Sequence, residues 1–381
     1  MLKRTCTCGD PRKENAGDTI TLSGWVNTYR DQGKGLVFID LRDRYGLTQV
    51  VFDAEDSPDE VMETGTTLRR EDVISVSGEI RIRDGKSNEK LETGEIELVA
   101  KEIEIINRTA KLPILPDDHD ADSIGEEHRL RHRYIDLRRP KMQKILALRH
   151  RITQFTRNFF AANDFLEIET PLLITPTPEG ARDFIVPSRH QAGQWYALPQ
   201  SPQIFKQILM VAGCDKYMQI CKCLRDEDPR ADRQAEFTQI DLEMSFVDQD
   251  DVISIMSEFA STLFKEVGSI DLGNLPQLSW KDAMDKYGSD RPDTRFDLKL
   301  TDVTELASKT EFNVFTEACQ SGGSVKAMRV PGGAELLSRK KTDALAEVAK
   351  TYGAGGLPVV KYQGGEFLTG VALEVDGGRC V

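Results

Sequence analysis

The segment at residues 224–243 gathers side chains that bind charged and aromatic ligands. Arg225 ends one strand-like run, a charged loop follows at 226–236, and an alternating run returns from Phe237. A strand turns every second side chain to the same face. The side chains that share this face are Phe237, Gln239, Asp241 and Glu243. Arginine binds phosphate or carboxylate, aspartate accepts from ammonium, and phenylalanine stacks on a base. The hairpin therefore predicts a site for a zwitterionic and phosphorylated ligand; the alternative is a solvated hairpin of paired charges.

Two other segments, 175–184 and 198–207, are similarly rich in charged and polar residues. They lie between strand-like runs at 166–170, 217–223 and 237–246, with a short helix expected at 202–211. Sequential strands joined by long polar loops predict an antiparallel sheet. A further amphipathic helix is predicted over 252–267.

A basic stretch precedes this region. Between residues 129 and 157 there are ten lysines and arginines and one acid, Asp136. Apolar residues recur there at helical spacing and predict one long amphipathic helix that ends near residue 162. These residues are Ile145, Leu148, Ile152, Phe155 and Phe159. The basic face is expected to contact a phosphate backbone; the alternative is the solvated face of a core helix.

The first 107 residues have a different pattern, with short β-branched runs separated by turns. The five runs are 19–26, 36–41, 47–52, 73–80 and 95–105. Five strands in this length are typical of an OB-fold barrel, in which the face of strands 2 and 3 binds oligonucleotides.

Composition narrows the function classes. Of 381 residues, 39% are hydrophobic and 30% charged, and the net charge is −13. This charge argues against non-specific coating of nucleic acid, and we expect no DNA partner. No apolar run reaches the roughly 18–20 residues of a membrane helix, and no apolar segment follows the basic start, so a cytoplasmic protein is expected. Seven cysteines are too few for a disulfide scaffold, and neither C-x-C pair (6/8 and 221/223) has the spacing of structural zinc.

Breaks in the pattern predict a multidomain α/β protein. Pro113, Pro116 and the acidic residues at 117–122 mark a linker, and paired glycines appear after residue 295. We expect a barrel at 1–107, a linker at 108–125, a sheet domain at 126–294 and a small α+β unit at 295–381.

On these motifs the sequence resembles the bacterial-type aspartyl-tRNA synthetases, members of the class II aminoacyl-tRNA synthetases. The resemblance covers essentially the whole chain. Residues 165–171 are similar to motif 1 of the class, and the hairpin at 224–243 is similar to motif 2. The other matching segments are 24–27, 38–43, 133–140, 179–183, 200–206 and 329–333. The resemblance implies four parts. They are an OB-fold anticodon-binding domain at 1–107, a hinge at 108–125, a class II catalytic domain with motifs 1 and 2 only at 126–294, and part of the bacterial insertion domain at 295–381.

The resemblance also implies an activity: ATP-dependent attachment of L-aspartate to tRNA(Asp) through an aspartyl-adenylate, by a homodimer. Nothing in 247–381 resembles motif 3, which carries Mg²⁺ ligands in this class. We therefore expect an N-terminal portion of a longer enzyme, with Mg²⁺ ligands outside these residues and no metal ligand within them. The alternative is a non-catalytic relic of a synthetase that binds tRNA or other RNA.

Roles of single residues follow from the same resemblance. Arg225 would be catalytic, because it would bridge the aspartate α-carboxylate and the α-phosphate of ATP. Lys206 would read the side-chain carboxylate of aspartate. The aspartate-binding residues would be Glu179, Ser201, Gln203, Lys206, Arg225 and Asp241. The ATP-binding residues would be Arg225, Glu227, Gln234 and Phe237. The anticodon-binding residues would be Arg30, Phe38, Gln49 and Glu95, although Phe38 has core packing as its alternative.

Overall fold

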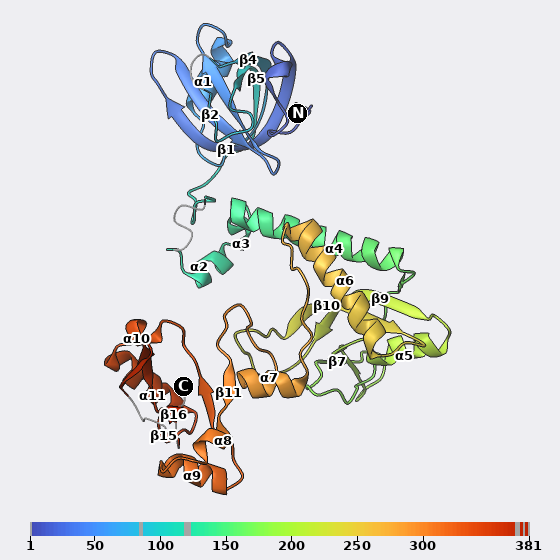
Figure 1. The fold of residues 1–381 in the computed structure, drawn as a ribbon. Helices are drawn as coiled ribbons and strands as arrows, with labels where there is room; N and C mark the ends of the chain where they lie inside the picture. Colours follow the sequence, from blue (N-terminus) through green and yellow to red (C-terminus); the bar gives the residue numbers. More distant parts are fainter. Residues whose placement is uncertain (1, 84–86, 118–122, 370–373, 376–377, 380–381) are drawn as a thin grey trace. The chain divides into compact units, whose positions relative to one another are not determined.

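The computed structural model describes residues 2–83, 87–117, 123–369, 374–375 and 378–379 (Figure 1). Its contacts divide the chain into two compact units, Met1–Asp271 and Leu272–Val381. The acidic residues at 118–122 of the expected linker lie outside the described part.

The first unit begins with the expected five-stranded barrel (Figure 1). The strands are β1 (Thr19–Asp31), β2 (Leu36–Arg42), β3 (Leu47–Asp53), β4 (Val73–Ile82) and β5 (Ile96–Asn107). They close in the order β1-β2-β3-β5-β4, antiparallel except for the β3–β5 pair. Alternate residues such as Leu22, Ile39 and Val50 fill the interior without exposure. A short 3-10 helix, η1 (Lys13–Asn15), precedes the barrel, and α1 (Asp59–Thr66), which the strand pattern did not predict, connects β3 to β4.

Barrel closure depends on a close approach between β4 and β5. The β4–β5 register shifts between Ser77 and Gly78. A Cβ atom at Gly78 would lie 1.9 Å from the carbonyl oxygen of Val99, so a side chain there would push the two strands apart.

Short helices lead from the hinge into the sheet domain: α2 (Glu126–Arg131), α3 (Arg133–Asp136) and the long α4 (Pro140–Ala162). The side chain of Asp136 is fully buried and accepts hydrogen bonds from the guanidinium groups of Arg129, Arg133 and Arg139. Burial opposes its ionisation, but these hydrogen bonds outweigh burial and lower the pKa of Asp136. Part of the predicted basic stretch therefore forms an internal ion cluster.

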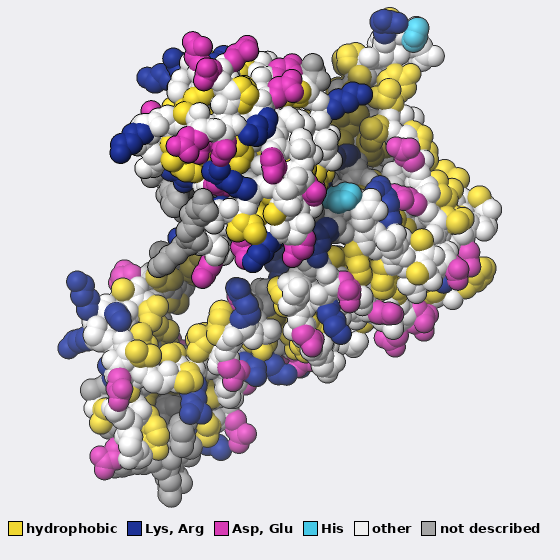
Figure 2. Space-filling model, turned by 90° about the horizontal axis from the view of Figure 1, so that it is seen from above, with side chains coloured by type: hydrophobic (Ala, Val, Ile, Leu, Met, Phe, Trp, Pro, Cys, Tyr) yellow, Lys and Arg dark blue, Asp and Glu magenta, His cyan; other side chains and the backbone are white. Residues whose placement is uncertain are grey.

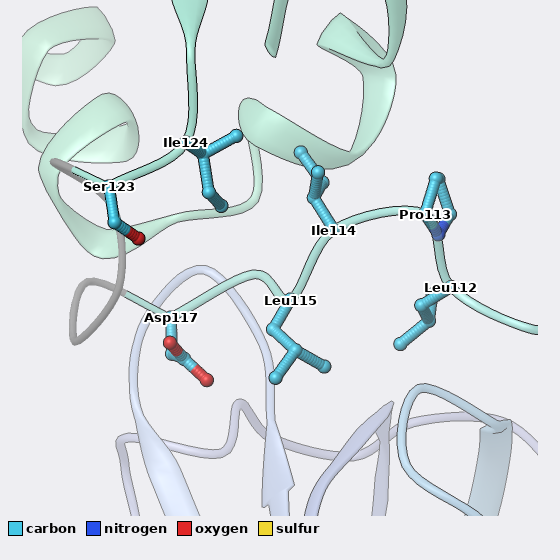
Figure 3. A pocket seen from close by; sticks show the side chains of 7 residues that line it. All are labelled: Leu112, Pro113, Ile114, Leu115, Asp117, Ser123 and Ile124. Atoms are coloured by element: carbon cyan, nitrogen blue, oxygen red, sulfur yellow. The ribbon is translucent and has the colours of Figure 1, made fainter. Parts of the chain in front are cut away.

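The hinge also contains a cavity of about 310 Å³, lined by residues of segments 112–117 and 123–124 (Figure 3). Apolar side chains, among them Leu112, Ile114, Leu115 and Ile124, make most of its wall. None of the candidate site residues lines this cavity.

The central sheet of the first unit has three strands in the order β10-β9-β6. The strands are β6 (Leu166–Glu167), β9 (Lys216–Leu224) and β10 (Glu236–Met244). β9 and β10 form the predicted antiparallel hairpin, whereas β6 joins β9 in parallel. The sheet is therefore mixed, since the chain returns to β9 through α5 (Gln203–Val211) and the small β7–β8 pair (Ile185–Pro187 and Trp195–Ala197). Phe160 of α4, Met218 of β9 and Phe259 of α6 (Gln249–Gly268) pack together on one side of the sheet.

The second unit is a small α+β assembly, as the glycine-rich composition predicts. Its helices are α7 (Trp280–Tyr287), α8 (Thr304–Ala307), α9 (Asn313–Gln320), α10 (Gly333–Leu336) and α11 (Arg339–Thr351). Its strands are β11 (Leu300–Asp302), β12 (Lys326–Met328), β13 (Lys361–Gln363), β14 (Glu366–Thr369), β15 (Glu374–Val375) and β16 (Gly378–Arg379). The contacts place the start of this unit at Leu272, and within it Lys326 of β12 binds Asp285 of α7 at 3.0 Å. No helix among the described residues of either unit is long and apolar enough to cross a bilayer.

Candidate functional site

The register of the β9–β10 hairpin gives its two faces different roles. Met218 and Ile220 of β9 pack with Ile240 and Leu242 of β10 on the helix-covered side. The other face carries the cross-strand pairs Tyr217–Glu243, Gln219–Asp241, Cys221–Gln239 and Cys223–Phe237. The polar residues singled out on β10 therefore share one face, as their alternation predicts.

Lys206 of α5 reaches this face and pairs with two carboxylates. Its Nζ lies 2.9 Å from Asp241 Oδ1 and 3.3 Å from Glu243 Oε2. The side chains of Lys206 and Asp241 are only 12% and 4% exposed. Burial disfavours the Lys206 charge, but the hydrogen bonds and charges of both acids outweigh it and raise its pKa. Burial also raises the pKa of Asp241, an effect that Lys206 only partly offsets.

Two buried polar atoms near this network have no hydrogen-bond partner among the described residues: Asp241 Oδ2 and Arg225 Nε. The guanidinium of Arg225 lies over the ring of Phe237, 5.2 Å from its centroid. The backbone N–H of Arg225 donates to the carbonyl of Ala235 at 2.8 Å, which fixes the strand end. Because buried polar groups are nearly always satisfied, an unpaired acceptor and an unpaired donor indicate a ligand that supplies both partners.

Glu179 comes from one loop and meets Ser201 and Gln203, which lie at the start of α5. Ser201 Oγ donates to Glu179 Oε2 at 2.9 Å and accepts from the backbone N–H of Gln203 at 3.1 Å. Gln200, 1% exposed, anchors the loop that carries Glu179. Its amide donates to Asp183 at 2.6 Å and exchanges hydrogen bonds with the Ala181 backbone.

The candidate ATP residues of the charged loop are more open. Glu227 accepts from the Arg233 guanidinium at 2.7 Å, and Gln234 is exposed. The loop is joined to the 179–183 segment because the Asp226 N–H donates to the Arg182 carbonyl at 3.0 Å. Glu227 is therefore already engaged by an arginine of its own loop.

The outer face of the barrel carries a polar network across all five strands. Arg30 of β1 donates to Asp40 of β2 and to Gln49 of β3, each at 3.1 Å. Gln49 donates to Glu97 of β5 at 2.7 Å, and Glu97 accepts from Arg81 of β4 at 2.8 Å. This network brings together two of the four predicted anticodon residues.

The other two predicted anticodon residues make none of the hydrogen bonds of this network, although Phe38 neighbours it. Phe38 is half-buried and stands opposite Arg30 in the β1–β2 register, outside the buried interior cluster. Glu95 is exposed and precedes β5.

Figure 2 shows basic and acidic side chains interleaved on the face in view, consistent with local contacts rather than one broad basic field.

The closed barrel and the sheet with its arginine hairpin are the two parts that the family comparisons match. Residues 125–350 match the family model of tRNA synthetases class II (D, K and N), and residues 20–106 match that of the OB-fold nucleic acid binding domain. The chain therefore belongs to the class II tRNA synthetases.

Two bacterial relatives give a more specific comparison than the family models. The chain is 49% identical over 363 residues to the aspartate–tRNA ligase of Bacillus licheniformis, and 49% identical over 365 residues to the aspartate–tRNA(Asp/Asn) ligase of Bacillus subtilis. Each match covers 95% of this chain and 61% of the relative, so the chain spans about three fifths of their length.

Solved structures show the same fold at lower identity. Asparaginyl-tRNA synthetase from Pyrococcus horikoshii, complexed with asparaginyl-adenylate, matches with a TM-score of 0.62 and 24% identity, over 71% of this chain and 59% of that one. A putative aspartyl-tRNA synthetase from Leishmania major matches with a TM-score of 0.62 and 23% identity, over 71% and 54%.

Sequence reasoning missed several residues of these networks. Glu243 was placed on the correct face but not recognised as a second partner of Lys206. Glu97, rather than Glu95, joins the barrel network. Period-2 alternation could have found Glu97, because it extends the outward-facing series on β5.

Proposed function

We propose that the protein attaches L-aspartate to tRNA(Asp) in an ATP-dependent reaction through an aspartyl-adenylate. The observation that carries this proposal is the charge pattern of one hairpin, which carries the Lys206–Asp241–Glu243 network on one face and Arg225 at the end of β9. Matches to aspartate–tRNA ligases add independent support.

The network offers aspartate both a cationic and an anionic contact. Lys206, Asp241 and Glu243 together carry one positive and two negative charges when ionised. The α-ammonium of aspartate supplies the missing positive charge beside Asp241 Oδ2, and its side-chain carboxylate shares Lys206. Glu179, held by Ser201, adds a second acceptor for the ammonium, with Gln203 beside it. Lys206 already has two carboxylate partners, so the side-chain carboxylate of aspartate must displace Asp241 or Glu243 from it when aspartate binds.

Arg225 positions the reacting groups. An oxygen of the aspartate α-carboxylate attacks the α-phosphorus of ATP, the bond to the β-phosphate breaks, and pyrophosphate leaves. Arg225 binds both the carboxylate and the α-phosphate, so it offsets charge as they approach. Phe237, beneath the guanidinium, offers its ring to adenine, and Glu227 and Gln234 contact ATP from the loop.

Mg²⁺ is expected to accompany ATP in such a reaction, where it neutralises phosphate charge. Across the described ranges, no group of three His, Cys, Asp or Glu side chains is arranged as metal ligands.

The barrel supplies tRNA recognition in this proposal. Phe38 stacks on unpaired anticodon bases. Arg30 and Gln49 read the polar edges of these bases, and Glu95 contacts them from the start of β5. Gln49 is 5% exposed, so its reading of a base requires that Arg30 exchange partners.

We also propose a cytoplasmic homodimer. Ile145 and Leu148 of α4 are 49% and 42% exposed, which suits a self-complementary interface. Sedimentation at micromolar concentration should give a dimer, and Ile145→Asp should shift it toward monomer; a monomeric parent protein would contradict this part of the proposal.

Aspartate-dependent ATP–pyrophosphate exchange tests the chemistry. Arg225→Lys keeps the charge but removes the bidentate fork, so exchange should fall at least 100-fold, or roughly 3 kcal/mol. Lys222→Met is the matched control, because Lys222 lies on the same hairpin but is 57% exposed and pairs only with Glu236. Robust exchange in Arg225→Lys would refute the assigned role. Binding of the anticodon stem-loop by a protein without exchange would favour a non-catalytic RNA-binding function.

A further inference from the structure

A buried tyrosine and a buried glutamine lie beside Asp241 on the polar face of the β9–β10 hairpin. Tyr217 and Gln219 of β9 are 0% and 8% exposed. In the register of the hairpin, Gln219 stands directly opposite Asp241, and Tyr217 stands opposite Glu243. Burial raises the pKa of the Tyr217 hydroxyl, and the neighbouring charge of Asp241 raises it further. The fold therefore places an O–H donor beside the carboxylate of Asp241.

The Tyr217 hydroxyl donates its hydrogen to Gln219 rather than to Asp241. The distance from Tyr217 Oη to Gln219 Oε1 is 2.8 Å. Thr170, which ends the segment before β7 that resembles motif 1, donates its own hydroxyl to the same oxygen at 2.9 Å. An amide oxygen has two lone pairs, so these two donors satisfy it. A hydroxyl has one hydrogen, so Tyr217 cannot serve Gln219 and Asp241 at the same time.

The two oxygens of the Asp241 carboxylate consequently differ. Oδ1 accepts from Lys206 Nζ at 2.9 Å. Oδ2 is buried and has no hydrogen-bond partner in the part of the chain that the structure describes. Hydrogen bonds to a carboxylate are stronger than those to a neutral amide. A Tyr217 hydroxyl that loses its acceptor on Gln219 is therefore expected to donate to Asp241 Oδ2.

We propose that Gln219, held by Thr170, is a positioning residue that engages the Tyr217 hydroxyl and so keeps Asp241 Oδ2 open for the α-ammonium of the amino-acid substrate. The identity of that ligand rests on the proposed function, whereas the competition between the two acceptors does not. The arrangement acts on the ammonium contact and leaves Arg225 unchanged. Its effect therefore belongs in the KM for aspartate rather than in kcat.

Aspartate-dependent pyrophosphate exchange tests this role. Gln219→Met keeps the side chain long but removes its oxygen, so KM for aspartate should rise roughly 10-fold or more, with kcat changed less than about 3-fold. Adding Tyr217→Phe to Gln219→Met removes the competing donor and should return KM to within about 3-fold of the parent value. Tyr196→Phe, at an exposed tyrosine of β8, is the matched control and should leave KM unchanged. An unchanged KM in Gln219→Met would overturn the proposal, as would a double variant whose KM stays as high as that of Gln219→Met.

Carbon-13 NMR titration of the Asp241 carboxyl tests the competition without substrate. A hydrogen bond to the ionised form of a carboxyl lowers its pKa. The pKa of Asp241 should therefore fall in Gln219→Met and rise again when Tyr217→Phe is added. Lys206, Glu243 and Cys221 also act on this carboxylate and are the same in all these variants. An Asp241 pKa that is equal in Gln219→Met and the parent protein would overturn the proposal.

Thr170→Val supplies a milder second variant, because it loosens Gln219 without removing the amide oxygen. It should raise KM and lower the pKa of Asp241 in the same directions, and Tyr217→Phe should reverse both changes. Changes that Tyr217→Phe does not reverse would contradict the competition. If the Asp241 pKa changes as expected but the parent protein shows no exchange, the result counts against the proposed function and the competition between the two acceptors stands.

Discussion

Replacing Lys206 by methionine removes the cation between Asp241 and Glu243 without a large change in volume. Asp241 is the more sensitive partner, since its side chain is 4% exposed whereas that of Glu243 is 30% exposed. Breaking a buried ion pair by deleting one partner costs roughly 3–5 kcal/mol. In the variant, Asp241 must remain ionised without its cation or take up a proton.

Protonation of Asp241 sets an upper limit on the free energy of unfolding that Lys206→Met loses. A carboxyl with an ordinary pKa near 3.9 is neutralised at pH 7 for about 4 kcal/mol, and at pH 5 for about 1.5 kcal/mol. The pKa of Asp241 is already raised, and loss of Lys206 raises it further. A folded-state pKa above the unfolded value means that the folded state binds more protons, so stability falls as pH rises through this window. Lys206→Met should therefore cost about 3–4 kcal/mol at pH 7 and about 1.5 kcal/mol or less at pH 5.

Urea unfolding at both pH values, combined with hydrogen exchange of the β9 and β10 amides, measures the loss. Adding Asp241→Asn to Lys206→Met should restore most of the stability, because it removes the stranded charge. Lys222→Met, which disrupts an exposed pair, should change stability by less than about 1 kcal/mol. A loss that is the same at pH 5 and pH 7, or one that Asp241→Asn does not relieve, would refute the reasoning.

Three other changes give distinct expectations. Asp136→Asn removes the anion that the buried Arg139 and the more exposed Arg129 and Arg133 share, and should cost roughly 3 kcal/mol in urea unfolding at pH 7. Arg131→Ala, at an exposed pair, should cost under about 1 kcal/mol; equal effects would contradict the ion cluster. Gly78→Ala should lower barrel stability by roughly 1–3 kcal/mol or more, while Gly125→Ala, with open space at its Cβ, should be tolerated when thermal unfolding is compared. Gln200→Leu removes the partners of the half-buried Ala181 backbone and should cost roughly 1 kcal/mol or more, with faster proteolysis in the 179–183 loop; unchanged cleavage would contradict its anchoring role.

Local patterning made the barrel and the hairpin face predictable from sequence. Alternating residues such as Ile39 and Val50 define an interior whatever the rest of the chain does. The helix ending near 162 was equally visible, because its apolar spacing is internal to one element. The charges of the hairpin could be assigned to one face for the same reason.

Features that depend on contacts between distant residues could not be predicted from the sequence. The pairing of Lys206 with Glu243 as well as Asp241 depends on how α5 docks on β10, which no local period encodes. β6 pairs in parallel with β9 because the chain crosses back through the long segment between residues 167 and 216, which no local period encodes. The boundary at Leu272 depends on contacts between distant residues, and glycine content alone points to a later start.

Closure of the barrel has a consequence for the order of events during synthesis. Every strand of the barrel lies between Thr19 and Asn107, and its last pairings, β5 with β3 and β4, need nothing that follows. The ribosome adds about 5–20 residues per second, and N-terminal domains generally fold first. The barrel can thus close while the β9–β10 hairpin, more than a hundred residues later, is still untranslated. The nascent chain would then carry a folded barrel before its sheet domain exists.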